Sequence, residues 1–146
     1  MTLNKALILA ASAHEGQTDR AGANYMLHVL SVMHLLDDRV ADDTMRSIAL
    51  LHDVVEDSEV TFEDLENYGF NYRVVSAVKA LTKIKGQSLK EYKRKVFGNL
   101  DAMYVKLADL THNSDMSRLK GKVSLRDLDR TAKYHQFISE IKETLY

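Results

Sequence analysis

The sequence predicts an all-α fold, a single-domain helical bundle over residues 1–146. The chain has no proline and only six glycines, whereas sandwiches and barrels usually recruit proline to their many turns. Apolar residues make up 45% and charged residues 28% of the chain, which is ordinary for a globular domain with a sizeable core. No segment shows the convincing apolar and polar alternation of a strand.

The first two helices are predicted from apolar spacing. A helix over residues 3–13 would bury one side formed by Leu3, Leu7, Ala10 and Ala11. Residues 14–24 are polar and contain two glycines, so we expect a loop there. A second helix over residues 25–36 would bury a stripe formed by Leu27, Leu30, Val32, Leu35 and Leu36.

The middle helices are predicted from capping residues as well. Asp42 or Asp43 would cap a helix that carries apolar residues from Met45 to Val55. Thr61 resembles the start of a capping box, with Asp64 at its third position, and opens a short helix that ends near Gly69. A further helix spans residues 74–81.

The C-terminal half is also predicted to consist of helices with recognisable capping residues. After a basic loop at residues 83–87, Ser88 and Glu91 form a full capping box for a helix that runs to about Gly98. Residues 101–112 predict an apolar helix interrupted by Lys106 and Asp109. After a turn at Gly121, Ser124 caps a last helix, supported by Leu125, Leu128, Ala132, Phe137, Ile138 and Ile141.

Charge and composition exclude several classes of function. With 20 basic and 21 acidic residues, the chain has no overall attraction to nucleic acid or to an anionic membrane. It has no cysteine, so any metal site must use His, Asp or Glu, ligands that suit Mn, Mg, Fe or Zn. No apolar run approaches the roughly 20 residues of a membrane span, and no signal peptide is visible. We therefore expect a cytoplasmic protein; assembly into a homo-oligomer stays open.

The segment His52–Asp57, HDVVED, carries the strongest chemical signal. On one continuous helix, His52 would share a face with Glu56, and Asp53 with Asp57. The preceding residues 48–51 are apolar, which sets this segment beside a core, where ionised carboxylates are costly unless paired or bound to metal. A divalent metal with a catalytic acid and base pair would account for all four residues.

Two further apolar segments each carry a misplaced polar group, His28 in YMLHVL and Asp109 in VKLADLTHN. Together with His52 and Asp53 they would supply two imidazoles and two carboxylates, a set that suits Mn, Fe or Zn. The competing interpretation treats His28 and Asp109 as hydrogen-bonded core groups or as exposed residues. We favour the metal, because an adjacent His-Asp inside an apolar helix has few structural uses.

These residues resemble the HD superfamily of metal-dependent phosphohydrolases, whose pattern is a His, then His-Asp, then a distant Asp. More narrowly, they resemble the hydrolase domain of the RelA/SpoT-type alarmone enzymes and their small stand-alone relatives. The matching segments follow the family's order over roughly residues 6–116. They are His14–Gln17, Gly22, Tyr25–His28, Leu50–Asp57, Thr61, Leu81–Lys83, Lys106–Asp109 and His112–Asn113.

The resemblance implies an all-helical fold with one divalent metal, usually manganese, although zinc, iron and magnesium stay open. It implies removal of the 3′-pyrophosphate of guanosine tetra- or pentaphosphate, a small-molecule nucleotide substrate. Glu56 and Asp57 correspond to the acidic pair that orients and activates water. The metal ligands implied are His28, His52, Asp53 and Asp109, and the substrate contacts are Arg20, Tyr25, Lys106 and Asn113.

The chain departs from the family around the substrate. The family's Arg-Lys-Ser-Gly is Asp19-Arg20-Ala21-Gly22 here, and its Leu-Ala-Asp-Arg ends in Leu110. An acid at position 19 should repel a polyanionic substrate, although exposed charges are screened. Two alternatives therefore stay open: an HD phosphatase acting on another nucleotide such as NADPH, and a nucleotide-binding module without catalysis.

Several other residues have two interpretations. Tyr25 is either a base-stacking residue or a core aromatic residue, and His14 and His112 have either a role near the site or a structural one. The basic residues between 83 and 95 are expected to form a solvated face rather than a phosphate contact.

Overall fold

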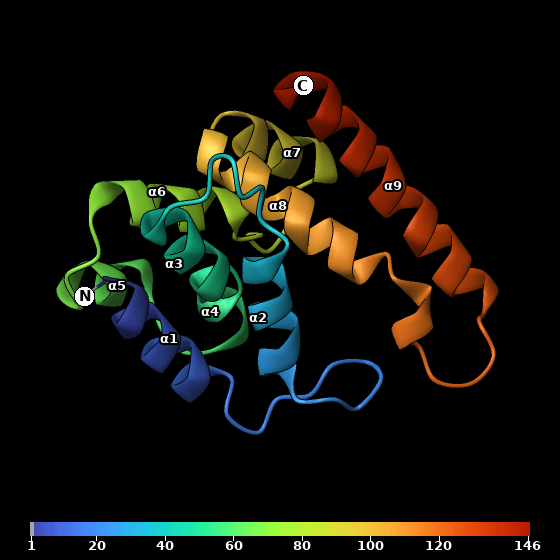
Figure 1. Ribbon diagram of the computed structural model, residues 1–146, viewed down its shortest axis with the longest axis horizontal. Coiled ribbons are helices and arrows are strands. Elements are labelled where there is room, and N and C mark those ends of the chain that lie inside the picture. Colours follow the sequence, from blue (N-terminus) through green and yellow to red (C-terminus); the bar gives the residue numbers. More distant parts are fainter. Residues whose placement is uncertain (1) are drawn as a thin grey trace.

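The computed structural model describes residues 2–146 and confirms the all-α class (Figure 1). Within these residues, strand pairing is limited to an isolated bridge between Thr18 and Asn24. None of the described helices has the length and apolar character needed to cross a membrane. The helices are α1 (Thr2–Ala13), α2 (Tyr25–His34), α3 (Asp43–Leu51), α4 (Val54–Asp57), α5 (Phe62–Asn67), α6 (Tyr72–Leu81), α7 (Leu89–Phe97), α8 (Leu100–Asn113), the 3₁₀ turn η1 (Met116–Arg118) and α9 (Leu125–Leu145).

Helix α3 lies at the centre of the main core, where it packs against α1, α2, α6 and α8. Its apolar side chains, such as Ile48 and Leu51, are fully buried. A second, smaller cluster joins α7 and α8 to the C-terminal part of α9, around Tyr92, Val96 and Ile141. Because α2, α3 and α8 contact one another, polar residues on their facing sides are brought to one place.

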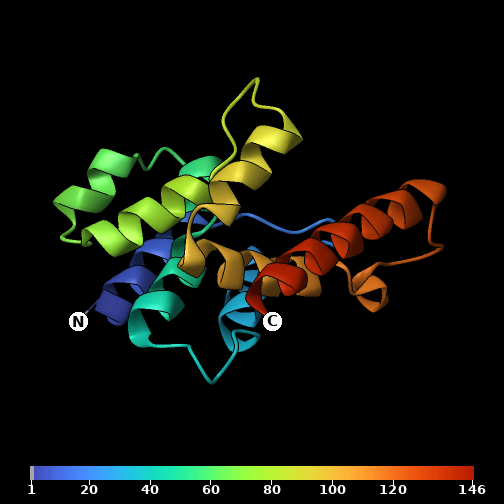
Figure 2. The ribbon, with the colours of Figure 1, turned by 90° about the horizontal axis from the view of Figure 1, so that it is seen from above.

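Helix α9 is the longest helix and packs unevenly. Its residues Phe137, Ile138 and Ile141 are buried, whereas its N-terminal half extends along the edge of the molecule, past the end of α8 (Figures 1 and 2). Leu125 and Leu128, two of the residues from which this helix was predicted, lie on it but are 85% and 50% exposed.

The buried faces of α1 and α2 also differ from those expected. Leu7, Leu27 and Leu35 are exposed, although the leucine spacing predicted them to be inside, and Ala11 is exposed as well. Ala10 on α1, and Val32 and Leu36 in and just after α2, are buried as expected. Ala6 and Leu9 on α1, and His28 and Val29 on α2, complete the inner faces. A short helix with apolar residues on several sides does not determine its own inner face; on α2, the face that packs inward carries His28.

The caps agree with the sequence in most places. Asp42 caps α3 by accepting the backbone N–H of Met45 at 2.8 Å, and Thr61 and Asp64 form the reciprocal box at α5. At α7 only half of the expected box is present, because Ser88 accepts the Glu91 N–H without a return bond from the Glu91 side chain. At α9, Ser124 and Asp127 form a complete box.

The helix expected through residue 57 is interrupted. Helix α3 ends at Leu51 and α4 begins at Val54, with His52 and Asp53 between them. Asp53 has φ −109° and ψ 0°, in the sparsely populated bridge region that active-site residues often occupy. The expectation of two polar rows on one continuous helix is therefore wrong, and this break leads directly to the site.

Candidate metal centre

The break between α3 and α4 lets two adjacent side chains approach the same point. On a regular helix, neighbouring side chains diverge by about 100°, which would aim His52 and Asp53 in different directions. Here His52 Nε2 lies 2.9 Å from Asp53 Oδ2. The break at Asp53 between α3 and α4 thus lets the imidazole of His52 and the carboxylate of Asp53 act together at one point.

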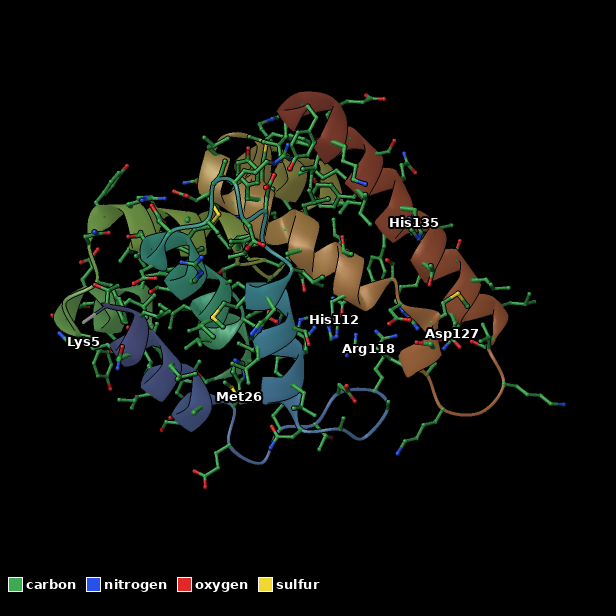
Figure 3. The ribbon with its side chains drawn as sticks, viewed as in Figure 1. Lys5, Met26, His112, Arg118, Asp127 and His135 are labelled. Carbon is green, nitrogen blue, oxygen red and sulfur yellow. The ribbon has the colours of Figure 1, made fainter. Side chains whose placement is uncertain are left out.

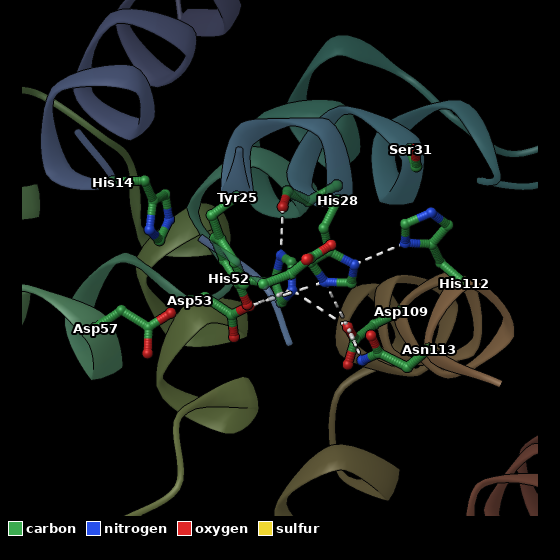
Figure 4. Close-up of polar contacts among 12 residues, drawn as sticks. His14, Tyr25, His28, Ser31, His52, Asp53, Asp57, Asp109, His112 and Asn113 are labelled. Atoms are coloured by element: carbon green, nitrogen blue, oxygen red, sulfur yellow. Dashed lines mark hydrogen bonds and ion pairs between the residues drawn. The ribbon is translucent and has the colours of Figure 1, made fainter. Parts of the chain in front are cut away.

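Helices α2 and α8 bring two more groups to this point (Figure 4). His28 Nε2 lies 3.0 Å from Asp109 Oδ1 and 4.0 Å from Asp53 Oδ2, and His52 Nε2 lies 3.5 Å from Asp109 Oδ1. One ligand atom from each of His28, His52 and Asp109 lies within 4.8 Å of the others. The structure therefore brings together all four residues that the sequence proposed as ligands.

The donor atoms fit a divalent cation. His52 Nδ1 contacts the backbone carbonyl oxygen of Ala49 at 2.6 Å, so it must carry the proton and donate. This leaves the lone pair of Nε2 facing the cluster, and Nε2 is buried without a hydrogen-bond partner. A buried, unpartnered acceptor is unusual, and two imidazoles with two carboxylates suit a divalent metal. The site thus has the chemistry of a metal centre.

His112 supports His28 from behind. Their Nδ1 atoms lie 2.7 Å apart, so one must donate and the other accept. Burial, with the nearby charge of Arg118, lowers the pKa of His112 to about 4, which keeps this ring neutral near pH 7. If His28 donates, its Nε2 lone pair is free for the cation, the usual arrangement of a second-layer partner in metal sites.

Each carboxylate of the cluster also has a supporting partner. Asp109 accepts from Lys106 Nζ at 2.9 Å and from Asn113 Nδ2 at 3.0 Å, and Asp53 accepts from the hydroxyl of Tyr25 at 2.5 Å. Burial alone would favour neutral Asp109, but Lys106 and the two histidines hold its pKa well below the usual range. Tyr25, Lys106 and Asn113, which the sequence proposed as substrate contacts, thus also hold the carboxylates in place.

The cluster opens into a cavity of about 410 Å³, lined by residues that include Tyr25, His52, Asp53, Lys106 and Asp109. Cavities of this size accommodate small-molecule ligands. Besides residues of α2, α6, α7 and α8, its wall includes residues of the loop 14–24, of α4, of η1 and of the N-terminal half of α9. The exposed half of α9 is therefore a wall of the cavity.

Glu56 and Asp57, the acidic pair that follows His52 and Asp53 in the sequence, lie in different surroundings. Glu56 lines the cavity, and its Oε1 accepts the backbone N–H of Lys83 at 2.8 Å. Burial raises the pKa of Glu56, and the charges of Asp53 and Asp57 add to the rise. Asp57 is exposed, does not line the cavity, and accepts from Gln17 Nε2 at 3.0 Å. Glu56 is thus the acid that faces the cavity.

The altered loop has an arrangement that the sequence did not indicate. Asp19, expected to face the substrate as a repelling charge, forms an ion pair with Arg118 at 3.1 Å. Arg20 is exposed and lines the cavity. No motif marks Arg118, which lies five positions after Asn113. The contact between Asp19 and Arg118 spans 99 positions of sequence, so only the fold could show that they meet.

Comparison with known proteins gives a consistent result. A family model described as HD domain matches residues 6–130. The chain is 35% identical over 121 residues to the bifunctional (p)ppGpp synthase/hydrolase SpoT of Escherichia coli K12, covering 76% of this chain and 17% of that protein. The same identity and coverage relate it to the guanosine-3′,5′-bis(diphosphate) 3′-pyrophosphohydrolase of Vibrio cholerae.

The chain therefore spans about a sixth of the length of these curated relatives. Among solved structures, a metazoan orthologue of SpoT, described as hydrolysing ppGpp and acting in starvation responses, superimposes with a TM-score of 0.77. That match has 28% sequence identity and covers 96% of this chain and 84% of the other.

Proposed function

The chain belongs to the HD-domain family, and from this membership we propose that it is a metal-dependent nucleotide phosphohydrolase that removes the 3′-pyrophosphate of (p)ppGpp. The observation that carries the proposal is the buried, unpartnered Nε2 of His52, which lies among His28, Asp53 and Asp109 beside a cavity large enough for a nucleotide. The relatives named for (p)ppGpp hydrolysis support this choice of substrate.

We propose that these four residues hold one divalent ion, because imidazole nitrogens together with carboxylate oxygens suit Mn, Fe or Zn. Among these we propose manganese, the ion that the resemblance to the HD superfamily implies. The ion would polarise a phosphoryl oxygen and make water more acidic. Residues 1–146 would act as one HD-type hydrolase domain on a small-molecule nucleotide.

Glu56 is the proposed general base. Its carboxylate faces the cavity, and its raised pKa brings it closer to the pH at which a base is most efficient. The Lys83 N–H holds one oxygen, so the other is available to take a proton from the attacking water. Asp57, held by Gln17, would hold or relay that proton. Lys106, beside Asp109 in the cavity wall, adds positive charge where phosphate oxygens would lie.

The test is turnover of a nucleotide panel by the purified chain, with and without Mn²⁺, followed by chromatography of the products. We expect pyrophosphate and GDP from guanosine tetraphosphate. Orthophosphate from NADPH would instead favour the other phosphatase, and binding without turnover would favour the module without catalysis. Absence of Mn²⁺-dependent turnover on guanosine tetraphosphate contradicts the proposal.

A further inference from the structure

Arg118 reaches from η1 across the wall of the cavity to the loop of residues 14–24. Its guanidinium donates to the backbone carbonyl oxygen of His112 at 2.9 Å and to Asp19 Oδ2 at 3.1 Å. Figure 3 shows Arg118 beside His112, between α8 and that loop. Asp19 and Arg118 both line the cavity, so the ion pair forms part of its wall.

The acid that holds Arg118 is itself fixed. Asp19 Oδ1 accepts the backbone N–H groups of Ala21 and Ala23 at 2.9 and 3.0 Å. Although burial opposes the charged form, these bonds and Arg118 keep the pKa of Asp19 below its usual value. One oxygen of Asp19 thus orders its loop, while the other orients the guanidinium.

Arg118 keeps hydrogen-bonding capacity. A guanidinium has five N–H donors in a planar fork, and two of its nitrogens each make one of the contacts above. The side chain is 25% exposed, and the other acid nearby, Asp115, is engaged by the N–H and the hydroxyl of Ser117. An oriented guanidinium with free donors at a cavity wall matches the geometry of phosphate oxygens.

The position of Arg118 indicates which phosphate it would contact. Its bond to α8 is to the backbone carbonyl oxygen of His112, and the ring of that same residue contacts the ligand His28. Arg118 is therefore joined to the metal cluster through His112 and bonds to none of the four proposed ligands, whereas the phosphate to be cleaved must lie on the cluster.

We propose that Arg118, oriented by Asp19, binds the phosphate group that is retained, the 5′-diphosphate of a guanosine nucleotide. This inference rests on the proposed function for the identity of the nucleotide. It gives the altered loop a positioning role, because Asp19 orients the guanidinium of Arg118 and so acts on the substrate through it.

The test uses GDP, the expected product, because GDP carries the retained phosphates and lacks the group that is cleaved. GDP is titrated calorimetrically into the Mn²⁺-loaded protein and into its Arg118→Gln variant. We expect about tenfold weaker binding in the variant, the loss typical of one hydrogen bond to a charged group. Arg118→Lys should fall between the two, since it keeps the charge and loses the fork.

Two variants separate anion binding from a merely structural ion pair. Asp19→Asn breaks the ion pair but keeps an oxygen for the loop bonds and leaves Arg118 in place, so GDP affinity should stay within about threefold. Arg73 lies outside the cavity and forms ion pairs with Asp42 and Asp101 that are comparable to the pair of Arg118 with Asp19. Arg73→Gln should therefore leave GDP affinity unchanged. A loss in Arg118→Gln no larger than that in Arg73→Gln would overturn the proposal.

Guanosine without phosphate provides the remaining comparison, measured as a competitor of GDP. Its affinity should be the same in the parent and in Arg118→Gln; an equal loss would show that Arg118 contacts the base, which contradicts the proposal. The test of this inference, GDP binding, and the test of the proposed function, hydrolysis, can fail independently. Hydrolysis of guanosine tetraphosphate with unchanged GDP binding in Arg118→Gln rejects this inference alone, whereas Arg118-dependent GDP binding without hydrolysis rejects the proposed function alone.

Discussion

The cavity has two parts that are built differently. We call the metal cluster of His28, His52, Asp53 and Asp109 its floor, and the loop of residues 14–24, η1 and the N-terminal half of α9 its mouth. At the floor, His28, His52 and Asp109 are 2%, 3% and 5% exposed, and each has a partner that fixes its orientation. At the mouth, the loop of residues 14–24, η1 and α9 contribute partly exposed side chains such as Arg118. Buried polar groups must be paired, whereas surface loops accept substitution. The floor is therefore fixed by the same packing that folds the protein, while the mouth is free to change its ligand contacts.

The comparison predicts the largest loss of activity at the floor. Asp53→Ala removes one proposed ligand and should reduce Mn²⁺-dependent turnover by about a thousandfold, since a metal contributes several kcal/mol to such a reaction. Steady-state rates at saturating Mn²⁺ measure this, with circular dichroism to verify the fold. Asp129→Ala, on the exposed face of α9, is the control and should retain full activity. A loss of less than tenfold in Asp53→Ala would remove this residue from the metal centre.

A smaller loss is expected one step out from the metal, at the proposed base. Glu56→Gln keeps an oxygen for the Lys83 N–H, so the fold should be retained while turnover falls about a hundredfold. A base works only when deprotonated, so activity should rise with pH through the pKa of Glu56. Because burial raises that pKa, this rise should lie above the range of an ordinary glutamate. The pH profile of the parent measures it, and the rise should be absent in Glu56→Gln.

The support behind the floor should have a weaker effect, seen in metal affinity. His112→Phe retains a ring but leaves His28 Nδ1 without its partner, and should weaken Mn²⁺ binding about tenfold, as loss of such partners usually does. Since the pKa of His112 is lowered to about 4, its ring stays neutral between pH 6 and 8 and the effect should be constant there. Titration with Mn²⁺ measures the affinity, and His135→Phe on α9 provides the control. An unchanged affinity would mean that His28 is oriented by its helix alone.

The same division explains how much the sequence alone could predict. The floor residues stand out because each is a polar residue in an apolar segment, a conflict that only pairing or a ligand resolves. His28, His52 and Asp109 could therefore be selected without knowing how α2, α3 and α8 pack. The break at Asp53 could not, since nothing in HDVVED differs from the pattern of a regular helix.

The mouth was harder to predict, because its contacts depend on tertiary structure. The sequence predicts a repelling charge at Asp19, because its partner Arg118 lies 99 positions away. Leucine spacing likewise misassigned Leu27 and Leu35 on α2, because the packing of that helix selects the face with His28. Caps made by residues close in sequence, such as the box of Thr61 and Asp64, were predicted correctly.

The smallest effect is expected where the loop of the mouth contacts the acidic pair. Gln17 accepts from His14 Nδ1 at 2.8 Å and donates to Asp57 at 3.0 Å, so it joins the loop to the end of α4. Gln17→Leu breaks both bonds and should lower turnover about fivefold, because the bond to Asp57 holds a carboxylate that lies outside the cavity wall. Gln136→Leu, which removes an exposed amide on α9, is the matched control and should have no effect. If Gln17→Leu instead lost as much activity as Glu56→Gln, Asp57 would be as important for turnover as Glu56. Gln17 would then act with the residues around the metal rather than with the rest of its loop.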